Sequence, residues 1–413
     1  MKLKHLSTAM ILATLPATGV FAAALDRSGQ SVSAFLQPGN YFEAGISVLD
    51  PTVKGQSTAA TGSQNISDMG GDYQFYNAAL KLQLTDYLSF GLIYDQPFGA
   101  DAEYHDSTLF TNDAGNTKVE VDTQNISMLF GVQPIKNVNL YAGGVYQTVK
   151  GGVQLRGAGY GGVNLFGGYN ADIPEDSAAG WLVGAAYQIP EIALKASVTY
   201  RSEIKHKVNI DESSVGAMVP GSLAPVINNP AVVPGKPATG STDITTPQSV
   251  NLDLQTGIMA DTVAFANVRW VNWKDFAIRP YAFGIASNIA GANPAINKPN
   301  GFDLVAYTDD QWSVNAGVGR KLSEQWAGNV SVGWDSGAGN PITTLGPTEG
   351  YWNLGVGVQF SPAANYFISG GVKYFWLGDA KAQSGGDFNT DKYLADFTDN
   401  HAIAYGMKIG YRF

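Results

Sequence analysis

The chain ends in the stretch His401-Ala-Ile-Ala-Tyr-Gly-Met-Lys-Ile-Gly-Tyr-Arg-Phe413, and this stretch decides the fold. Aromatic and aliphatic residues occupy alternate positions from Ile403 to Phe413, and small or cationic residues stand between them. Because side chains alternate between the two faces of a β-strand, one face of this segment is apolar. A tilted strand crosses a bilayer with about 9–11 residues. We therefore predict a terminal membrane-spanning strand whose apolar face meets lipid.

The same alternation recurs upstream in ten clear stretches, and weaker versions fit at 41–49, 138–149 and 263–273, so the total is 14 strands. Six short turns, near residues 85, 135, 190, 261, 323 and 363, alternate with seven longer loops. The loops span roughly 50–72, 97–117, 150–178, 205–246, 275–309, 335–349 and 377–398. Short periplasmic turns and long extracellular loops are typical of outer-membrane barrels. We predict an all-β fold, a 14-stranded antiparallel transmembrane β-barrel over residues 41–413.

Composition excludes several classes of function. The chain has 413 residues, no Cys, 49 Gly, only 15% charged residues and a formal net charge of −10. The missing Cys excludes disulfides and thiolate chemistry, and the acidic balance argues against a nucleic-acid partner. The four His are isolated, without metal-ligand spacing. We therefore predict no catalytic residues, no metal site and no cofactor.

The N-terminus has the features of an export signal. Lys2 and Lys4 precede an apolar stretch from Ala9 to Val20, and small residues follow at 22–24. This order matches a signal peptide with its cleavage site. We predict that residues 1–24 are removed and that the mature chain reaches the outer membrane of a Gram-negative bacterium.

If the apolar positions face lipid, the residues between them face the lumen. We assign to the lumen Lys81, Lys195, Arg201, Arg269, Arg320, Lys373, Lys408 and Arg412, together with Asp122 and Asp253. One interpretation is that every barrel keeps its charges away from lipid. The other is that the cations guide an anionic headgroup through the barrel.

The third strand, Phe90 to Gly99, reads as a spanning strand until Pro97. Proline cannot donate to a strand ladder, and glycine permits a bend. Pro97 therefore either kinks the strand and opens a gap or simply begins a loop. Apolar residues in two loops, among them Leu155 and Met218, indicate contact with a hydrophobic molecule or packing of the loops on one another.

Four motifs resemble those of the outer-membrane long-chain fatty acid and hydrophobic compound transporters (FadL-like proteins). Tyr200-Arg-Ser-Glu203 resembles the Tyr-Arg-Ser-Glu motif of this family, and Trp270-Val-Asn-Trp273-Lys-Asp-Phe276 its aromatic–x–x–Trp–x–x–Phe segment. Trp326 to Trp334, followed by Asp335-Ser336, is similar to its strand before an Asp-Ser loop. Gly45 to Pro51 is similar to its first strand, and the order of the motifs agrees with the 14-strand count.

The resemblance implies a barrel plugged by an N-terminal hatch, here shortened to residues 25–40, with a lateral exit at a kinked third strand. It places the lateral gate at Pro97, Phe98 and Gly99. It also places Arg156 near the position where the family has a cation that binds the substrate carboxylate. We predict apolar substrate contacts at Leu155, Leu165, Phe166, Phe98 and Phe110. Asp309 and Asp310 stand where the family has a second cation.

We therefore predict a monomeric importer of hydrophobic molecules, chiefly long-chain fatty acids, embedded in lipid bilayer and lipopolysaccharide, without chemical conversion of its substrate. The missing second cation favours an alternative within this class, an importer of aromatic hydrocarbons or alkanes. A general diffusion porin is a second alternative. A membrane hydrolase that depends on His401 is a third.

Overall fold

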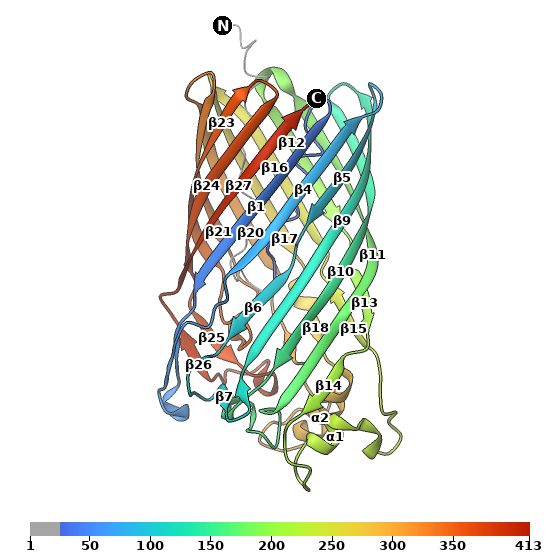
Figure 1. Cartoon of the computed structure of the whole chain (residues 1–413), viewed down its shortest axis with the longest axis vertical. Coiled ribbons are helices and arrows are strands. Elements are labelled where there is room, and N and C mark those ends of the chain that lie inside the picture. The colour runs from blue at the N-terminus through green and yellow to red at the C-terminus, as the bar shows by residue number, and fades with distance from the viewer. Residues whose placement is uncertain (1–24) are drawn as a thin grey trace.

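The computed structural model describes residues 25–413, so the predicted signal peptide lies outside the described residues. The protein is a closed barrel of antiparallel strands (Figure 1). Its sheet has 16 strands, of which β6 (Gly99–Glu103) and β14 (Asp211–Ser214) extend others, and 16 − 2 leaves 14 in the wall. These are β1 (Tyr41–Thr52), β4 (Tyr73–Gln83), β5 (Leu88–Asp95), β9 (Lys118–Ile135), β10 (Val138–Gln154), β11 (Tyr169–Ile189), β12 (Leu194–Arg201), β16 (Ser249–Met259), β17 (Thr262–Val271), β20 (Gln311–Lys321), β21 (Trp326–Asp335), β23 (Tyr351–Ala363), β24 (Tyr366–Leu377) and β27 (His401–Arg412).

The terminal stretch closes the barrel, as the predicted fold class requires. β27 pairs with β1 along its whole length, from Tyr41↔Arg412 to Thr52↔His401, and with β24 on its other side. The six short turns and the C-terminus lie at one end, which we call the turn end; the seven long connections lie at the loop end (Figure 1). The predicted 14-stranded antiparallel barrel is thus confirmed.

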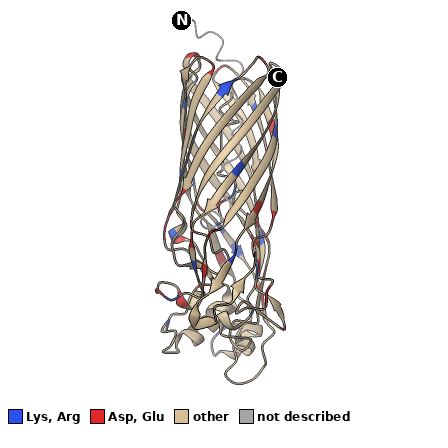
Figure 2. Cartoon of the chain, turned by 90° about the vertical axis from the view of Figure 1, so that its left-hand side faces the viewer, with Lys and Arg blue, Asp and Glu red and all other residues tan. Residues whose placement is uncertain are grey.

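The outer wall is apolar and carries few charged residues (Figure 2). On β27, Tyr405 is 49% and Met407 54% exposed, whereas the intervening Ala404 is 3% exposed. Two of the predicted lumen charges are wrong. Asp122 and Arg320 share the parity of the outward residues on their strands, and Asp122 makes a half-exposed ion pair with Lys150 near the loop end.

Several strands run further toward the loop end than the alternation predicts. β10 continues to Gln154 and β11 begins at Tyr169, inside the predicted 150–178 loop. The first residues of β11 include Asp172, Glu175 and Asp176, which interrupt the apolar alternation. A strand that leaves the bilayer no longer needs an apolar face, so the alternation fades before the strand ends.

The long loops fold into a cap over the loop end. Five short strands from three loops form one sheet in the order β22 (Ile342–Thr343), β25 (Ala380–Gln383), β26 (Ala395–Phe397), β2 (Gly55–Ser57) and β3 (Asn65–Ile66). The other cap elements are β7 (Thr111–Asn112), β8 (Gly115–Asn116), β13 (Ile204–Val208), β15 (Thr242–Thr246), β18 (Ala277–Ile278), β19 (Val305–Ala306), α1 (Ala224–Asn228) and α2 (Tyr281–Gly291). Within residues 25–413, neither helix is long and apolar enough to cross a membrane.

A half-buried carboxylate fixes the larger helix of the cap. Pro280 precedes α2 and gives it no side-chain cap. Glu212 of β14 instead accepts hydrogen bonds from the backbone N–H groups of Ala282 and Phe283, both at 2.7 Å. A carboxylate at a helix N-terminus satisfies free N–H groups and favours the helix dipole. Burial raises the pKa of Glu212, while these hydrogen bonds and one from Tyr169 act in the opposite direction.

A charge on the lipid side of β20 should destabilise the barrel, and the same charge on the lumen side should not. Val314 is 37% exposed on the outer wall, and its neighbour Asn315 lines an internal cavity. We expect Val314→Arg to lower the free energy of unfolding by about 2–4 kcal/mol, the cost of Arg on the lipid face of such barrels. Urea unfolding in lipid vesicles measures it, with Asn315→Arg as the matched control. Equal losses would contradict the assignment of the two faces.

Candidate functional site

The third strand of the wall is broken at residues 96–98. β5 pairs with β9 up to Asp95↔Asn125, and β6 resumes the same ladder at Gly99↔Asp122. The strand therefore continues beyond Pro97, which interrupts it and does not begin a loop. Because proline has no N–H group, it ends the local ladder at this point.

The broken strand lies between β9 and β4, and it leaves β4 incompletely paired. The ladder between β4 and β5 covers only Ala78↔Tyr94 to Gln83↔Ser89, although β4 begins at Tyr73. Toward the loop end, the two chains meet again at an isolated bridge between Gly70 and Ala102. We call the unpaired stretch between these limits, residues 73–77 facing residues 95–100, the lateral break. The Gln96 side chain partly closes it, accepting a 2.7 Å hydrogen bond from the Tyr76 amide.

The residues that precede β1 lie inside the barrel and dock on this break; we call residues 25–40 the plug segment. The Arg27 amide donates to the Pro97 carbonyl at 2.7 Å, and the Gly99 amide donates to the Leu25 carbonyl at 2.9 Å. Asp26 forms an isolated antiparallel bridge with Phe98. The plug segment thus supplies backbone partners that the interrupted ladder does not.

Buried charges hold the beginning of the plug segment. Arg269 of β17 binds the Asp26 carboxylate through two nitrogens, Nε at 2.7 Å and Nη2 at 3.2 Å. Both side chains are buried, at 3% and 7% exposure. Ser28 donates a 2.6 Å hydrogen bond to Asp95, the last residue of β5. The plug segment is therefore tied to the opposite wall and to the broken strand at once.

An aromatic side chain holds the middle of the plug segment. Phe35 is 1% exposed and packs edge-on against Tyr141 of β10, with ring centroids 5.7 Å apart. A Cβ atom on Gly91 would lie 2.3 Å from the Phe35 ring, and one on Gly131 would lie 2.8 Å from it. The two glycines, which lie on neighbouring strands, therefore form a socket for the Phe35 ring. A side chain at either position would collide with the ring.

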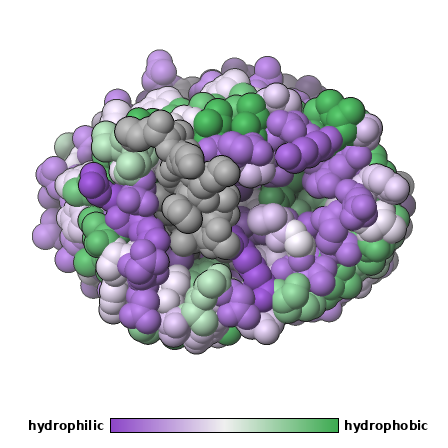
Figure 3. Space-filling model, turned by 90° about the horizontal axis from the view of Figure 1, so that it is seen from above, coloured by the Kyte–Doolittle hydropathy of each residue, from purple (hydrophilic) through white to green (hydrophobic). Residues whose placement is uncertain are grey.

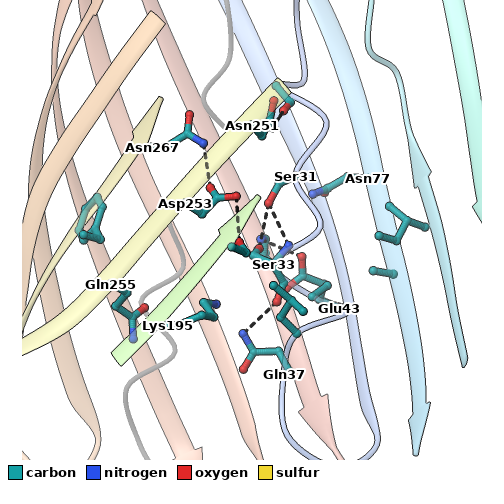
Figure 4. Close-up of a pocket in the computed structure, with 18 of the residues that line it drawn as sticks. Ser31, Ser33, Gln37, Glu43, Asn77, Lys195, Asn251, Asp253, Gln255 and Asn267 are labelled. Atoms are coloured by element: carbon teal, nitrogen blue, oxygen red, sulfur yellow. Dashed lines mark hydrogen bonds and ion pairs between the residues drawn. The ribbon is translucent and has the colours of Figure 1, made fainter. Parts of the chain in front are cut away.

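Between the plug segment and the wall lies a cavity of about 520 Å³ (Figure 4). This volume lies within the roughly 300–1,000 Å³ of ligand pockets. Its polar lining includes Ser31, Ser33, Gln37, Glu43, Asn77, Lys195, Asn251, Asp253, Gln255 and Asn267. Hydrophilic residues also surround the barrel mouth at the turn end (Figure 3). Tyr76 and Tyr94 belong to the cavity lining, so the cavity reaches the lateral break.

On the loop-end side of the plug segment the surroundings are apolar. Leu25 and Phe98 border a void of about 20 Å³ together with Trp273, Phe276 and Ile278. Trp273 packs edge-on against Phe98, with ring centroids 5.5 Å apart, and against Phe276 at 5.2 Å. We call these five residues, Leu25, Phe98, Trp273, Phe276 and Ile278, the apolar seam. The plug segment thus separates an apolar region from a cavity in which charged and polar side chains are mixed with apolar ones.

The structure brings the predicted apolar contacts together in the loop-end half. Leu155, Phe166, Phe98 and Phe110 are buried members of one hydrophobic cluster, and Leu165 packs against it. Other apolar loop residues remain exposed on the cap, namely Val163, Val215, Met218, Val219 and Val232. The loops therefore pack on one another and also present apolar side chains to solvent.

Arg156, predicted near the substrate carboxylate, is buried in the cap at 3% exposure. Its Nη1 donates to the carbonyls of Leu155 and Tyr169 at 2.9 and 2.8 Å. Its Nη2 binds the side chains of Gln154 and Asn170, and its Nε binds the Ala114 carbonyl. All five N–H groups of the guanidinium thus point at protein acceptors, and a carboxylate would have to displace one of them.

Two acids stand where the resemblance places a second cation. Asp310 accepts hydrogen bonds from Trp270 Nε1 at 3.1 Å and from Asn272 Nδ2 at 3.0 Å. It orders the segment that carries Trp273 to the apolar seam. Nearby in the cap, burial raises the pKa of Glu349 to about 7, and the carboxylates of Asp335 and Asp309 act in the same direction. Within residues 25–413, no group of His, Asp and Glu could hold a metal ion.

Sequence reasoning singled out Pro97, Phe98 and Gly99 but not the residues that meet them. Asp26 and Arg27 are the only charged residues in the plug segment. Their charge was the one feature of the sequence that could have indicated a contact with the wall. Their partners cannot be read from spacing, since Asp26 and Arg269 lie 243 positions apart. Arg269 itself was assigned to the lumen, where it lies.

Comparisons with known proteins agree with this architecture. The sequence model of a family described as "Outer membrane protein transport protein (OMPP1/FadL/TodX)" matches residues 28–413. A Pseudomonas aeruginosa FadL homologue has a similar structure, with TM-score 0.69, 15% identity and 96% coverage of both chains. The toluene transporters TodX of P. putida (TM-score 0.58, 14% identity, 92% of this chain and 91% of that one) and TbuX of Ralstonia pickettii (0.57, 13%, 96% and 97%) are also similar. No curated protein sequence matches the chain.

Removing the plug anchor should make the barrel leaky. Asp26→Asn leaves Arg269 buried without its counter-charge, a change that costs about 3–5 kcal/mol for a buried pair. We expect the variant to show larger and more frequent ion-conducting events in planar bilayers than the unmodified protein. The control is Asp303→Asn, which breaks a half-exposed pair with Arg279 in the cap. Unchanged conductance in Asp26→Asn would contradict the role of this ion pair.

Proposed function

We propose, because the chain belongs to the OMPP1/FadL/TodX family of outer-membrane transport proteins, that it takes up long-chain fatty acids through the lateral break. The family comprises outer-membrane β-barrels of Gram-negative bacteria that transport hydrophobic compounds, and its members are channels rather than enzymes. In this proposal the substrate crosses unchanged and the protein performs no chemistry on it. The proposal places the turn end in the periplasm and the cap outside the cell.

The observation that carries the proposal is the change of polarity across the plug segment. A hydrophobic molecule is stabilised in the apolar seam, where Leu25, Phe98 and Trp273 meet. To continue straight through the barrel it would have to enter a cavity lined by Lys195, Asp253 and many polar side chains. Transfer of apolar surface into such water-accessible space is unfavourable, at about 25 cal/mol per Å². The lateral break offers a way into the bilayer that avoids this cost.

Uptake begins, in this proposal, at the exposed apolar residues of the cap. Met218 and Val219 are 63% and 47% exposed and attract hydrophobic molecules from water. The cap also contains a cluster of packed rings that includes Phe166 and Phe283, with centroids 4.6 Å apart. Local opening of these loops passes the molecule to the apolar seam. Each transfer is driven by burial of apolar surface and needs no energy source.

The exit step requires the plug segment to leave the break. Three backbone hydrogen bonds join the plug segment to Pro97 and Gly99. The Arg27 and Ser28 amides donate to the Pro97 carbonyl at 2.7 and 3.4 Å, and the Gly99 amide donates to the Leu25 carbonyl at 2.9 Å. Displacement of these contacts, together with the hydrogen bond between the Tyr76 amide and Gln96, opens the lateral break. A substrate in the apolar seam can then move between β4 and the broken strand into lipid.

A second candidate within the same class is a carrier of monoaromatic hydrocarbons. Arg156 already has five protein acceptors, and Asp309 and Asp310 replace the second cation, so the cap offers little to a carboxylate. Two similar structures are named as toluene transporters. Competition between oleate and toluene for uptake by the same cells separates the two substrates.

Closing the lateral break should stop uptake without unfolding the barrel. In Gln96→Val/Pro97→Val the third strand regains the N–H group that proline lacks and can pair with β4. Each restored hydrogen bond contributes roughly 0.5–1.5 kcal/mol. A barrier higher by about 1.4 kcal/mol slows a step tenfold, so we expect about a tenfold loss of oleate uptake. The readout is uptake of labelled oleate by cells that lack their own transporter.

The control variant is Leu84→Val/Thr85→Val, at a turn-end site outside the break. It should leave uptake within the range of the unmodified protein. Unchanged uptake in Gln96→Val/Pro97→Val, with the barrel shown to be folded, would contradict lateral exit. A large and steady ion conductance of the unmodified protein would instead support the porin alternative.

A further inference from the structure

Arg27 of the plug segment carries a charged edge that no protein group uses. Its side chain is 6% exposed, yet Nε and Nη2 are both buried without a hydrogen-bond partner. These two nitrogens form one edge of the guanidinium fork, the edge that binds a carboxylate through two parallel hydrogen bonds. Leaving buried donors without partners is unfavourable, and more so when the donors are charged.

Two other buried arginines in the described chain, Arg269 and Arg156, show the fork with its partners in place, whereas buried Arg201 also leaves its Nε without one. Arg269 uses the same two nitrogens, Nε and Nη2, to grip the Asp26 carboxylate. Arg156 directs all of its N–H groups at protein oxygens. Arg27 follows Asp26 directly in the chain, and its fork edge is left without such a partner. The structure therefore contains both a filled and an unfilled version of the same binding geometry.

The unfilled fork lies at the lateral break. The Arg27 guanidinium carbon lies 3.7 Å from the centroid of the Tyr73 ring, at the start of β4. On the other edge of the break, a Cβ atom on Gly99 would lie 2.0 Å from Nη1 of Arg27. The side chain thus spans from β4 to β6, and glycine at position 99 leaves it room. Asp101 of β6 lies near this side chain, but within residues 25–413 the two groups form no ion pair.

The surroundings of the fork suit an amphiphile. Leu25, two residues before Arg27, borders the apolar seam with Phe98 and Trp273. Two residues of extended chain span about 7 Å. A charged contact and an apolar one therefore follow each other on the plug segment, in the order that a carboxylate and its alkyl chain would need.

We propose that Arg27 binds the carboxylate of a long-chain fatty acid at the lateral break, through Nε and Nη2, while the alkyl chain occupies the apolar seam. The inference rests on the proposed function, to which it adds the headgroup that the exit recognises. The fork is buried in the closed arrangement, so the carboxylate reaches it when the plug segment shifts. Binding then satisfies two charged donors that are unsatisfied in the closed state, which favours the shifted arrangement.

The test compares two ligands with the same chain and different headgroups, oleate and oleyl alcohol. Binding of each is measured by equilibrium dialysis on the purified full-length barrel in detergent. We expect Arg27→Gln to weaken oleate binding about tenfold or more, the effect of losing a charge-assisted pair of hydrogen bonds. Oleyl alcohol binding should change less than about twofold, since about 0.4 kcal/mol corresponds to a twofold change.

Two further variants separate the effect of the guanidinium fork from the effect of its charge and from a general effect of losing an arginine. Arg27→Lys retains the charge without the fork and should recover only part of the oleate affinity, which also covers the case in which Arg27→Gln fails to fold. Arg279→Gln removes a cap arginine that pairs with Asp303 and should affect neither ligand. Heat-dependent mobility on gels reports folding for each variant.

Equal losses of oleate and oleyl alcohol in Arg27→Gln would overturn the inference, because they indicate a structural role. Unchanged oleate binding in Arg27→Gln would also overturn it, while the proposed function would stand. If the unmodified protein binds neither oleate nor oleyl alcohol, the proposed function fails and the inference fails with it.

Discussion

Hydrogen bonding at the broken third strand is the constraint on which the rest of the structure depends. Inside a bilayer every backbone polar group needs a protein partner, because lipid provides none. Pro97 breaks the ladder, yet the surrounding groups are satisfied: its carbonyl accepts from Arg27, and the Phe98 amide donates to Thr123 Oγ1 at 2.8 Å. The plug segment is therefore part of the wall as well as an obstruction in the lumen. When the plug segment is displaced, the Pro97 carbonyl and the Gly99 amide lose these partners.

The same docking connects the chain's two physical environments. One anchor of the plug segment is ionic, at Asp26 and Arg269, and the other is apolar, at Phe35 in its glycine socket. Between them lies the cavity of mixed polar and apolar lining, and beyond Leu25 lies the apolar seam. Buried ion pairs add little net stability but are costly to break singly, so they favour one well-defined position over many. The plug segment thus has a defined closed position and a limited set of contacts to lose.

The sequence predicts the barrel well because one rule, alternation against lipid, applies to every spanning strand. The rule is weakest where the membrane ends, which explains the missed start of β11 at Tyr169. Asp122 and Arg320 were placed in the lumen against the parity of their own strands; parity was the sounder guide. The break at Pro97 carried a local signal, since proline and glycine are restricted in strands. Three other contacts could not be paired from the sequence because each joins distant segments: Asp26 with Arg269, Phe35 with Gly91 and Gly131, and Glu212 with α2.

Exit of hydrophobic molecules through the lateral break can be tested by closing the break with a disulfide. The chain has no Cys, so an introduced pair forms a single disulfide. Tyr76→Cys/Gln96→Cys joins the two edges that a hydrogen bond already connects. Leu80→Cys/Leu92→Cys, across a paired part of the same strands, is the control. Oleate uptake should be lost when the first pair is oxidised, should return on reduction, and should be unaffected by the second pair. Full uptake through the oxidised Tyr76→Cys/Gln96→Cys barrel would contradict exit through the lateral break.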